Sequence, residues 1–123
     1  MLTRSLADCK AILAGDKTLL RELLHPVRND VAIRYSLAHA TLPQGTASLP
    51  HRLKTSEVYY FISGQGRMHV DGEITPVGPE QTLYVPSGAA QYVENTGADD
   101  LVFLCIVDPA WRAEDEEVLK GKS

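Results

Sequence analysis

Short segments of alternating hydrophobic and polar residues follow one another along this chain, with turn-forming residues between them. The clearest segment covers residues 57–63 (EVYYFIS), where β-branched and aromatic residues predict a strand. Residues 101–107 (LVFLCIV) are apolar throughout, which is typical of a strand buried on both faces. Other strands are predicted over residues 18–24, 31–42, 67–70, 73–77, 81–85 and 91–94.

The segments between these strands carry turn signals. Asp71-Gly72 is typical of a hairpin turn, and residues 86–88 and 95–97 are rich in Pro, Gly, Asn and Ser or Thr. Strand and turn recur at short, regular spacing, and no long helical pattern interrupts them. This recurrence predicts an all-β sandwich or barrel.

The two ends of the chain show weaker patterns. Residues 18–24 fit a helical face as well as a strand, but a segment of that length, ended by Pro26, favours a strand. Residues 1–16 carry apolar side chains at nearly helical spacing, and the charged end of the chain predicts one helical turn near residues 114–119. We therefore expect short helical or irregular terminal segments around the β-rich centre.

The length of 123 residues is sufficient for one domain with a single core. We expect this domain to span residues 1–123, with an N-terminal strand or arm over 1–29, a barrel core over about 30–108 and a C-terminal tail over 109–123. No repeat, linker or low-complexity segment divides the chain.

The composition of the chain indicates which classes of partner to expect, but it says little about the activity. The chain has a net charge of −4 without a clustered basic patch, so we expect no nucleic-acid or anionic-membrane partner. No apolar run approaches the about 20 residues that span a membrane. Asp8 precedes any long apolar segment, so no signal peptide is expected. Cys9 and Cys105 form no disulfide framework, and a cytoplasmic location is expected.

Two spaced motifs carry a family resemblance. The first contains Gly45, His51, Glu57 and Gly64, and the second contains Pro86, Gly88 and Asn95. In spacing and order they resemble the two motifs of the cupin superfamily. Nearly the whole chain is similar to small single-domain cupins of the type-2, mannose-6-phosphate-isomerase-like group. The resemblance implies a double-stranded β-helix, or jelly-roll, barrel that commonly forms a homodimer.

The resemblance also implies a metal at the wide end of the barrel, held by three histidines and a glutamate. This sequence departs from that pattern, because Leu53 and Gln91 stand where two of the histidines are expected. Glu80 stands where the second motif opens with glycine. His51, Glu57 and Gln91 remain as metal-ligand candidates. Since imidazole is a good ligand for Mn, Fe, Ni or Zn, we expect such a metal to be weakly bound or absent.

Strand alternation identifies the candidate pocket. His51 and Leu53 point to the same side, since side chains two residues apart share a face. In a barrel that side is the cavity, and the resemblance implies that Glu57, Tyr59 and Phe61 face it from the next strand. Gln91 would face it from a later strand. Leu53 makes this pocket more apolar, which favours an organic ligand over a hydrated cation.

Three functions stay open at this point. The first is a small-molecule-binding cupin, for a sugar-like or carboxylate ligand, in which His51 and Glu57 form a polar or acid–base pair. The second is a metal-dependent enzyme of the isomerase or oxygenase kind that uses His51, Glu57 and Gln91. The third is a non-catalytic interaction domain with a vestigial pocket. Cys105 is expected to be a buried small hydrophobe.

Overall fold

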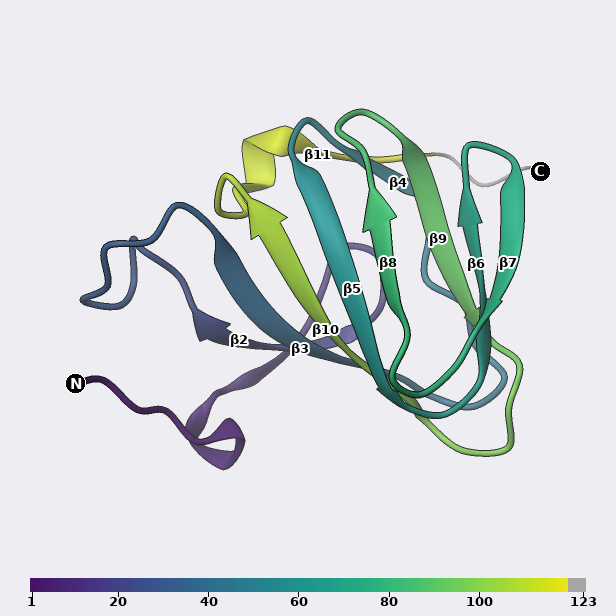
Figure 1. The fold of residues 1–123 in the computed structure, drawn as a ribbon, viewed down its shortest axis with the longest axis horizontal. Coiled ribbons are helices and arrows are strands. Elements are labelled where there is room, and N and C mark those ends of the chain that lie inside the picture. Colours follow the sequence, from purple (N-terminus) through teal and green to yellow (C-terminus); the bar gives the residue numbers. More distant parts are fainter. Residues whose placement is uncertain (120–123) are drawn as a thin grey trace.

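The computed structural model describes residues 1–119, and two antiparallel sheets that face each other account for about half of them (Figure 1). The six-stranded sheet has the order β1 (Ala11–Leu13), β2 (Leu19–Leu24), β3 (Ser36–Leu42), β10 (Leu101–Asp108), β5 (Ser56–Ser63) and β8 (Thr82–Val85). The five-stranded sheet has the order β11 (Glu116–Val118), β4 (His51–Leu53), β9 (Ala90–Asn95), β6 (Gly66–Val70) and β7 (Glu73–Val77). Two 3-10 turns, η1 (Leu6–Asp8) and η2 (Ala113–Asp115), flank the strands. The all-β barrel prediction is confirmed.

The centre of the six-stranded sheet is β10, which pairs with β3 on one side and with β5 on the other. Its inward residues Leu101, Phe103 and Cys105 are buried, in agreement with the apolar pattern. The prediction of burial on both faces is wrong for the outer face, where Ile106 is 36% exposed. The outward side chains of this strand are apolar without being enclosed.

One half of the space between the sheets is filled with large side chains. Phe61, Met68 and Leu101 are fully buried there, and Phe103 packs against Phe61 with ring centroids 5.5 Å apart. Inward positions on β5, β6 and β10 supply these side chains, as strand alternation requires. The packed half stabilises the barrel through the burial of apolar surface.

Two turn positions show why particular residues are needed. Gly64 has φ of +90°, and a Cβ atom there would lie 2.5 Å from the carbonyl oxygen of Asp100, so this turn accepts glycine alone without rearrangement. Glu80 has φ of +68° and stands where the second motif of the cupin superfamily opens with glycine. The chain therefore keeps the left-handed turn with a residue that adopts it less readily.

The terminal segments differ from expectation in several places. Residues 1–16, whose apolar side chains have nearly helical spacing, contain a 3-10 turn and the short strand β1, while β2 confirms the strand preferred for residues 18–24. The strand predicted over 31–42 begins only at Ser36. The helical turn near 114–119 is limited to η2, because β11 pairs with β4 and covers a sheet edge that would otherwise expose unpaired backbone groups. Within the described residues, no helix is long and apolar enough to cross a membrane.

Candidate functional site

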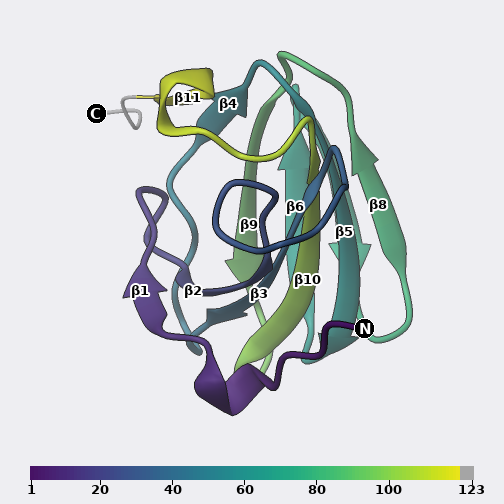
Figure 2. The same ribbon diagram turned by 90° about the vertical axis from the view of Figure 1, so that its left-hand side faces the viewer.

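The other half of the barrel interior is hollow. A cavity of about 680 Å³ lies between the sheets, and its lining includes His51, Leu53, Glu57, Tyr59 and Cys105. Figure 2 looks into this end of the barrel, where the connection between β2 and β3 lies in front of the space between the sheets. The cavity is large enough for a small organic molecule.

His51 enters the cavity wall from β4 and is 3% exposed. Its Nδ1 atom lies 3.1 Å from the carbonyl oxygen of Leu49. A carbonyl oxygen can only accept a hydrogen bond, so Nδ1 carries the proton in the neutral ring and Nε2 holds the lone pair. The ring is thus oriented as a base or a hydrogen-bond acceptor through Nε2.

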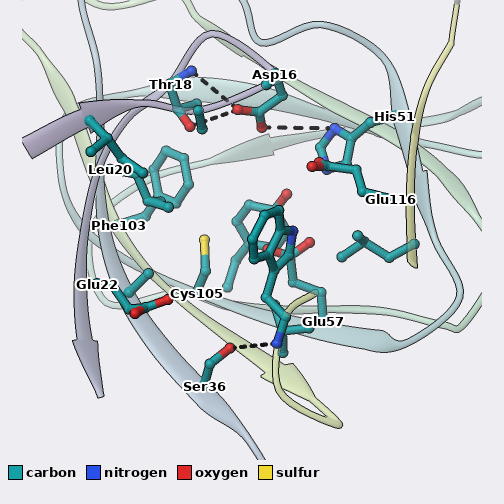
Figure 3. Close-up of a pocket in the computed structure, with 18 of the residues that line it drawn as sticks. Asp16, Thr18, Leu20, Glu22, Ser36, His51, Glu57, Phe103, Cys105 and Glu116 are labelled. Carbon is teal, nitrogen blue, oxygen red and sulfur yellow. Dashed lines mark hydrogen bonds and ion pairs between the residues drawn. The ribbon is translucent and has the colours of Figure 1, made fainter. Parts of the chain in front are cut away.

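Asp16 lies beside His51 and comes from the turn between β1 and β2. Its Oδ2 atom is 3.8 Å from Nδ1 of His51 (Figure 3). Its Oδ1 atom accepts hydrogen bonds from the backbone N–H and the hydroxyl of Thr18, at 3.2 and 2.8 Å. The carbonyl oxygen of Asp16 accepts a bond of 2.7 Å from the N–H of Leu49, which ties this turn to the segment before β4. The N-terminal arm therefore holds a carboxylate against the histidine.

Glu57 faces the cavity from β5 and is 6% exposed. Among the described residues, its Oε1 atom has no hydrogen-bond partner. Burial raises the pKa of Glu57 from 4.5 to about 7, although nearby His51, Cys105 and Gln91 favour the ionised form. Burial and the charge of Glu57 together raise the pKa of the Cys105 thiol well above its ordinary value. Glu57 thus exchanges a proton near neutral pH, whereas Cys105 stays a thiol.

A third carboxylate, Glu116, reaches the same cavity from β11. It pairs in register with Leu53 of β4, two residues from His51. Burial raises the pKa of Glu116, the charge of Asp16 acts in the same direction, and His51 opposes them. Figure 3 shows Asp16, His51 and Glu116 grouped together along one wall. One imidazole therefore lies among three carboxyl groups.

The model of a known family, the cupin domain, matches residues 38–107, more than half of the chain. This chain is a cupin. An uncharacterised protein of Methanocaldococcus jannaschii is 37% identical over 112 residues, which cover 90% of this cupin and 89% of that relative. An oxalate-binding protein of Thermotoga maritima is 32% identical over 71 residues, or 57% of this cupin and 59% of that protein.

Solved structures show the same fold. A nucleoside dehydratase from Streptomyces superposes with a TM-score of 0.79 at 16% identity, covering 100% of this cupin and 94% of that chain. A predicted oxalate decarboxylase from Thermotoga maritima gives a TM-score of 0.75 at 23% identity, covering 89% and 99% of the two chains. At these identities the likeness shows a shared fold, and it shows neither a shared ligand nor a shared activity.

The structure separates the pocket residues expected from alternation into two groups. His51, Leu53, Glu57 and Tyr59 line the cavity. Phe61 lies deeper on the same face of β5 and is fully buried in the packed half. Gln91 is 1% exposed, does not line the cavity, and accepts a hydrogen bond from the Tyr59 hydroxyl through Oε1. Alternation predicts the face of a strand, but not the depth along the barrel.

The side chains at the metal position do not fit a cupin metal centre. Leu53 offers no ligand atom, and the amide oxygen of Gln91 is already bonded to Tyr59. Across residues 1–119, no three His, Cys, Asp or Glu side chains gather in a way that could hold a metal ion. One imidazole and one buried carboxyl group remain from the usual set, which is a poor site for a transition metal.

Sequence reasoning missed Asp16 and Glu116. Gly15-Asp16 was interpretable as a turn, and Glu116 lies in an acidic run that predicts a solvated surface. Strand alternation over residues 116–118 is the one signal that could have found Glu116. It places the side chain of Glu116 toward the cavity and that of Glu117, which is 68% exposed, away from it. The wall of the cavity around His51 is therefore completed by Asp16 from the β1–β2 turn and Glu116 from β11.

Proposed function

We propose that this cupin binds a small organic molecule inside the barrel and does so without a transition metal. The observation that carries the proposal is the hollow half of the barrel, with apolar walls and polar groups gathered around His51. The unpartnered Oε1 of Glu57 supports it, because a buried polar atom without a hydrogen bond is costly and a ligand donor would satisfy it.

Proton transfer is the second candidate function. Glu57 has a pKa of about 7, and the hydrogen bond from Nδ1 of His51 to Leu49 leaves the lone pair of the ring on Nε2. Two such groups in one cavity suit general acid–base catalysis near neutral pH. The structural relative described as a nucleoside dehydratase is consistent with this class of chemistry, and its likeness extends to the fold alone. The reaction itself stays open.

In this proposal Gln91 holds Tyr59 in place and is not a metal ligand. The Tyr59 hydroxyl is fully buried and donates to Gln91, so both polar groups are satisfied within the wall. Only His51 and Glu57 would therefore remain as ligands for Mn, Fe, Ni or Zn, without the further imidazoles on which a cupin centre depends.

A screen of small organic fragments by ligand-observed NMR tests the proposal. Ala38 lines the cavity, so Ala38→Phe is expected to place a ring inside it and to weaken severalfold the binding of fragments that bind the wild-type protein. Ala32→Phe is the matched control, because Ala32 is exposed and lies outside the lining. Fragments that bind Ala38→Phe as well as wild type would contradict binding in the barrel.

The homodimer expected from the resemblance remains a proposal, and the outer face of the six-stranded sheet is its candidate surface. Tyr84, Val58 and Ile106 lie side by side in register across β8, β5 and β10. Tyr84 is 64% exposed. Sedimentation equilibrium of Tyr84→Lys is expected to show a monomer if this face joins two copies. Ile74→Lys, on the other sheet, is the control.

A further inference from the structure

The charges inside the cavity are unequal. Four carboxyl side chains line the cavity. Glu22 is paired with Arg28, which leaves three others, Asp16, Glu57 and Glu116, around a single imidazole. They arrive from separate parts of the chain, namely the β1–β2 turn, β5 and β11. Asp16 lies 3.8 Å from His51, Glu116 pairs in register with Leu53 two residues from His51, and Glu57 lines the same cavity.

Positive side chains also line the cavity, but they lie at its exposed edge, and both arginines interact with other side chains. Arg28 forms two hydrogen bonds with Glu22, at 2.5 and 3.0 Å, and its side chain is 53% exposed. Arg4 is exposed and donates to the sulfur of Cys9 at 3.2 Å. Lys10 is exposed. These cations are therefore poorly placed to balance the buried carboxyl groups.

Two further features of the interior indicate what the acidic wall would bind. Oε1 of Glu57 is buried, lines the cavity and, in the described part of the chain, has no donor. Leu53, Tyr59 and Phe103 supply apolar surface to the same cavity. A carbon skeleton would lie against these walls, and a donor group that carries positive charge would reach the carboxyl oxygens.

We infer that the ligand of this cavity is an organic cation whose protonated amine binds among Asp16, Glu57 and Glu116. The inference rests on the proposed function and names the ligand class for that site. It disfavours the carboxylate ligand suggested by the sequence, because an anion would meet three carboxyl groups in a poorly solvated space. It also distinguishes this cupin from the relative described as an oxalate-binding protein, since oxalate is a dianion.

Cys105 offers a way to measure the charge preference of the cavity, because it lines the cavity and is a free thiol. Its raised pKa lowers the reactive thiolate fraction equally for all three reagents, so only ratios of rates within one variant are compared. The experiment compares three methanethiosulfonates that share one reactive group: 2-aminoethyl (cationic), methyl (neutral) and 2-sulfonatoethyl (anionic). Cys9→Ser removes the second thiol, which lies outside the cavity lining. Rates are followed by mass spectrometry and divided by those of free cysteine.

After this correction, the cationic reagent is expected to modify Cys105 at least about tenfold faster than the anionic one. Glu116→Gln is expected to reduce that ratio severalfold, and Asp16→Asn is a second variant with the same expectation. Glu117→Gln is the matched control, because it makes the same change on the solvent face of β11 and should leave the ratio unchanged.

The outcomes separate the two proposals. Equal rates for the two charged reagents, or faster reaction of the anionic one, would overturn the cation preference while leaving an accessible cavity. A ratio that falls as much in Glu117→Gln as in Glu116→Gln would overturn the assignment to the interior carboxyl groups. If no fragment in the screen described above binds the wild-type protein more tightly than Ala38→Phe, the binding cavity itself is overturned, and the ligand class with it.

Discussion

The two halves of the barrel interior are built from the same strands and have opposite characters. On β5, Glu57 and Tyr59 face the cavity, whereas Phe61 on the same face is fully buried in the packed half. On β10, Cys105 faces the cavity and Leu101 is fully buried. Side-chain size changes along each strand, from large apolar residues at one end to smaller or polar residues at the other.

This difference gives the two halves of the barrel interior different roles. The packed half supplies the close apolar contacts that stabilise a domain of this size. The hollow half gives up such contacts and retains buried titratable groups, which are unfavourable unless paired or bound to a ligand. Substitutions in the first half should therefore act on stability, and those in the second should act on binding and pH dependence.

The largest effect is expected at Phe61. Phe61→Ala would leave a cavity among fully packed neighbours, and such changes cost about 3–5 kcal/mol in the free energy of unfolding. Urea unfolding followed by circular dichroism measures this cost. Ile62→Ala, at a position on the outer face that is 42% exposed, is the control and should cost far less. Equal costs would mean that the packed half does not dominate stability.

Glu57 is expected to produce the next largest effect, through pH. Its pKa is raised from 4.5 to about 7 in the folded chain, so the folded state binds this proton more tightly than the unfolded state. The resulting stabilisation is fully present below pH 4.5 and is lost as the pH rises through about 7. The difference corresponds to about 3 kcal/mol.

Glu57→Gln removes this titration. The difference in unfolding free energy between wild type and variant is expected to change by about that amount between pH 4 and pH 8. Glu73→Gln, on the exposed strand β7, provides a control with the same loss of a carboxyl group. A difference that stays constant with pH would show that Glu57 is ionised at an ordinary pKa.

Much of the barrel could be predicted from the sequence, because its signals are local. Strands such as β5 contain β-branched and aromatic residues, and turns such as Asp71-Gly72 use residues that suit them. The spacing of Gly45, His51 and Glu57 then indicated the family. Each of these signals can be read within about twenty residues of chain.

The candidate site was less predictable, because it depends on contacts between distant segments. Asp16 lies against His51 through the β1–β2 turn, and Glu116 arrives through the pairing of β11 with β4. Neither residue belongs to a motif. Alternation also placed Phe61 and Glu57 on one face without distinguishing the packed half from the hollow half. Depth along the barrel depends on which side chains oppose each other across the two sheets.

Placing histidines at positions 53 and 91 is expected to change the free energy of metal binding by about as much as Glu57 changes the free energy of unfolding. His51 and Gln91 are register partners on β4 and β9, and Leu53 shares the inward face with His51. Since a complete zinc site contributes about 10–16 kcal/mol, Leu53→His with Gln91→His should tighten zinc binding at least about 100-fold. Isothermal titration calorimetry measures the affinity, with Gln91→His alone as the comparison. An unchanged affinity would contradict the positions assigned to these two residues.

Tyr59 lies at the boundary between the two halves, and its substitution should have the smallest effect. Tyr59→Phe keeps the ring that packs against Phe61 and Phe103 but removes the hydroxyl that donates to Gln91. The buried amide oxygen would then lack this donor, at a cost of about 1–3 kcal/mol in the free energy of unfolding. The double variant Tyr59→Phe with Gln91→Leu removes both partners and should recover part of that loss, because no unpaired acceptor remains. If the double variant is as unstable as the sum of the single variants, the two groups do not interact, and Gln91 does not hold Tyr59 in place.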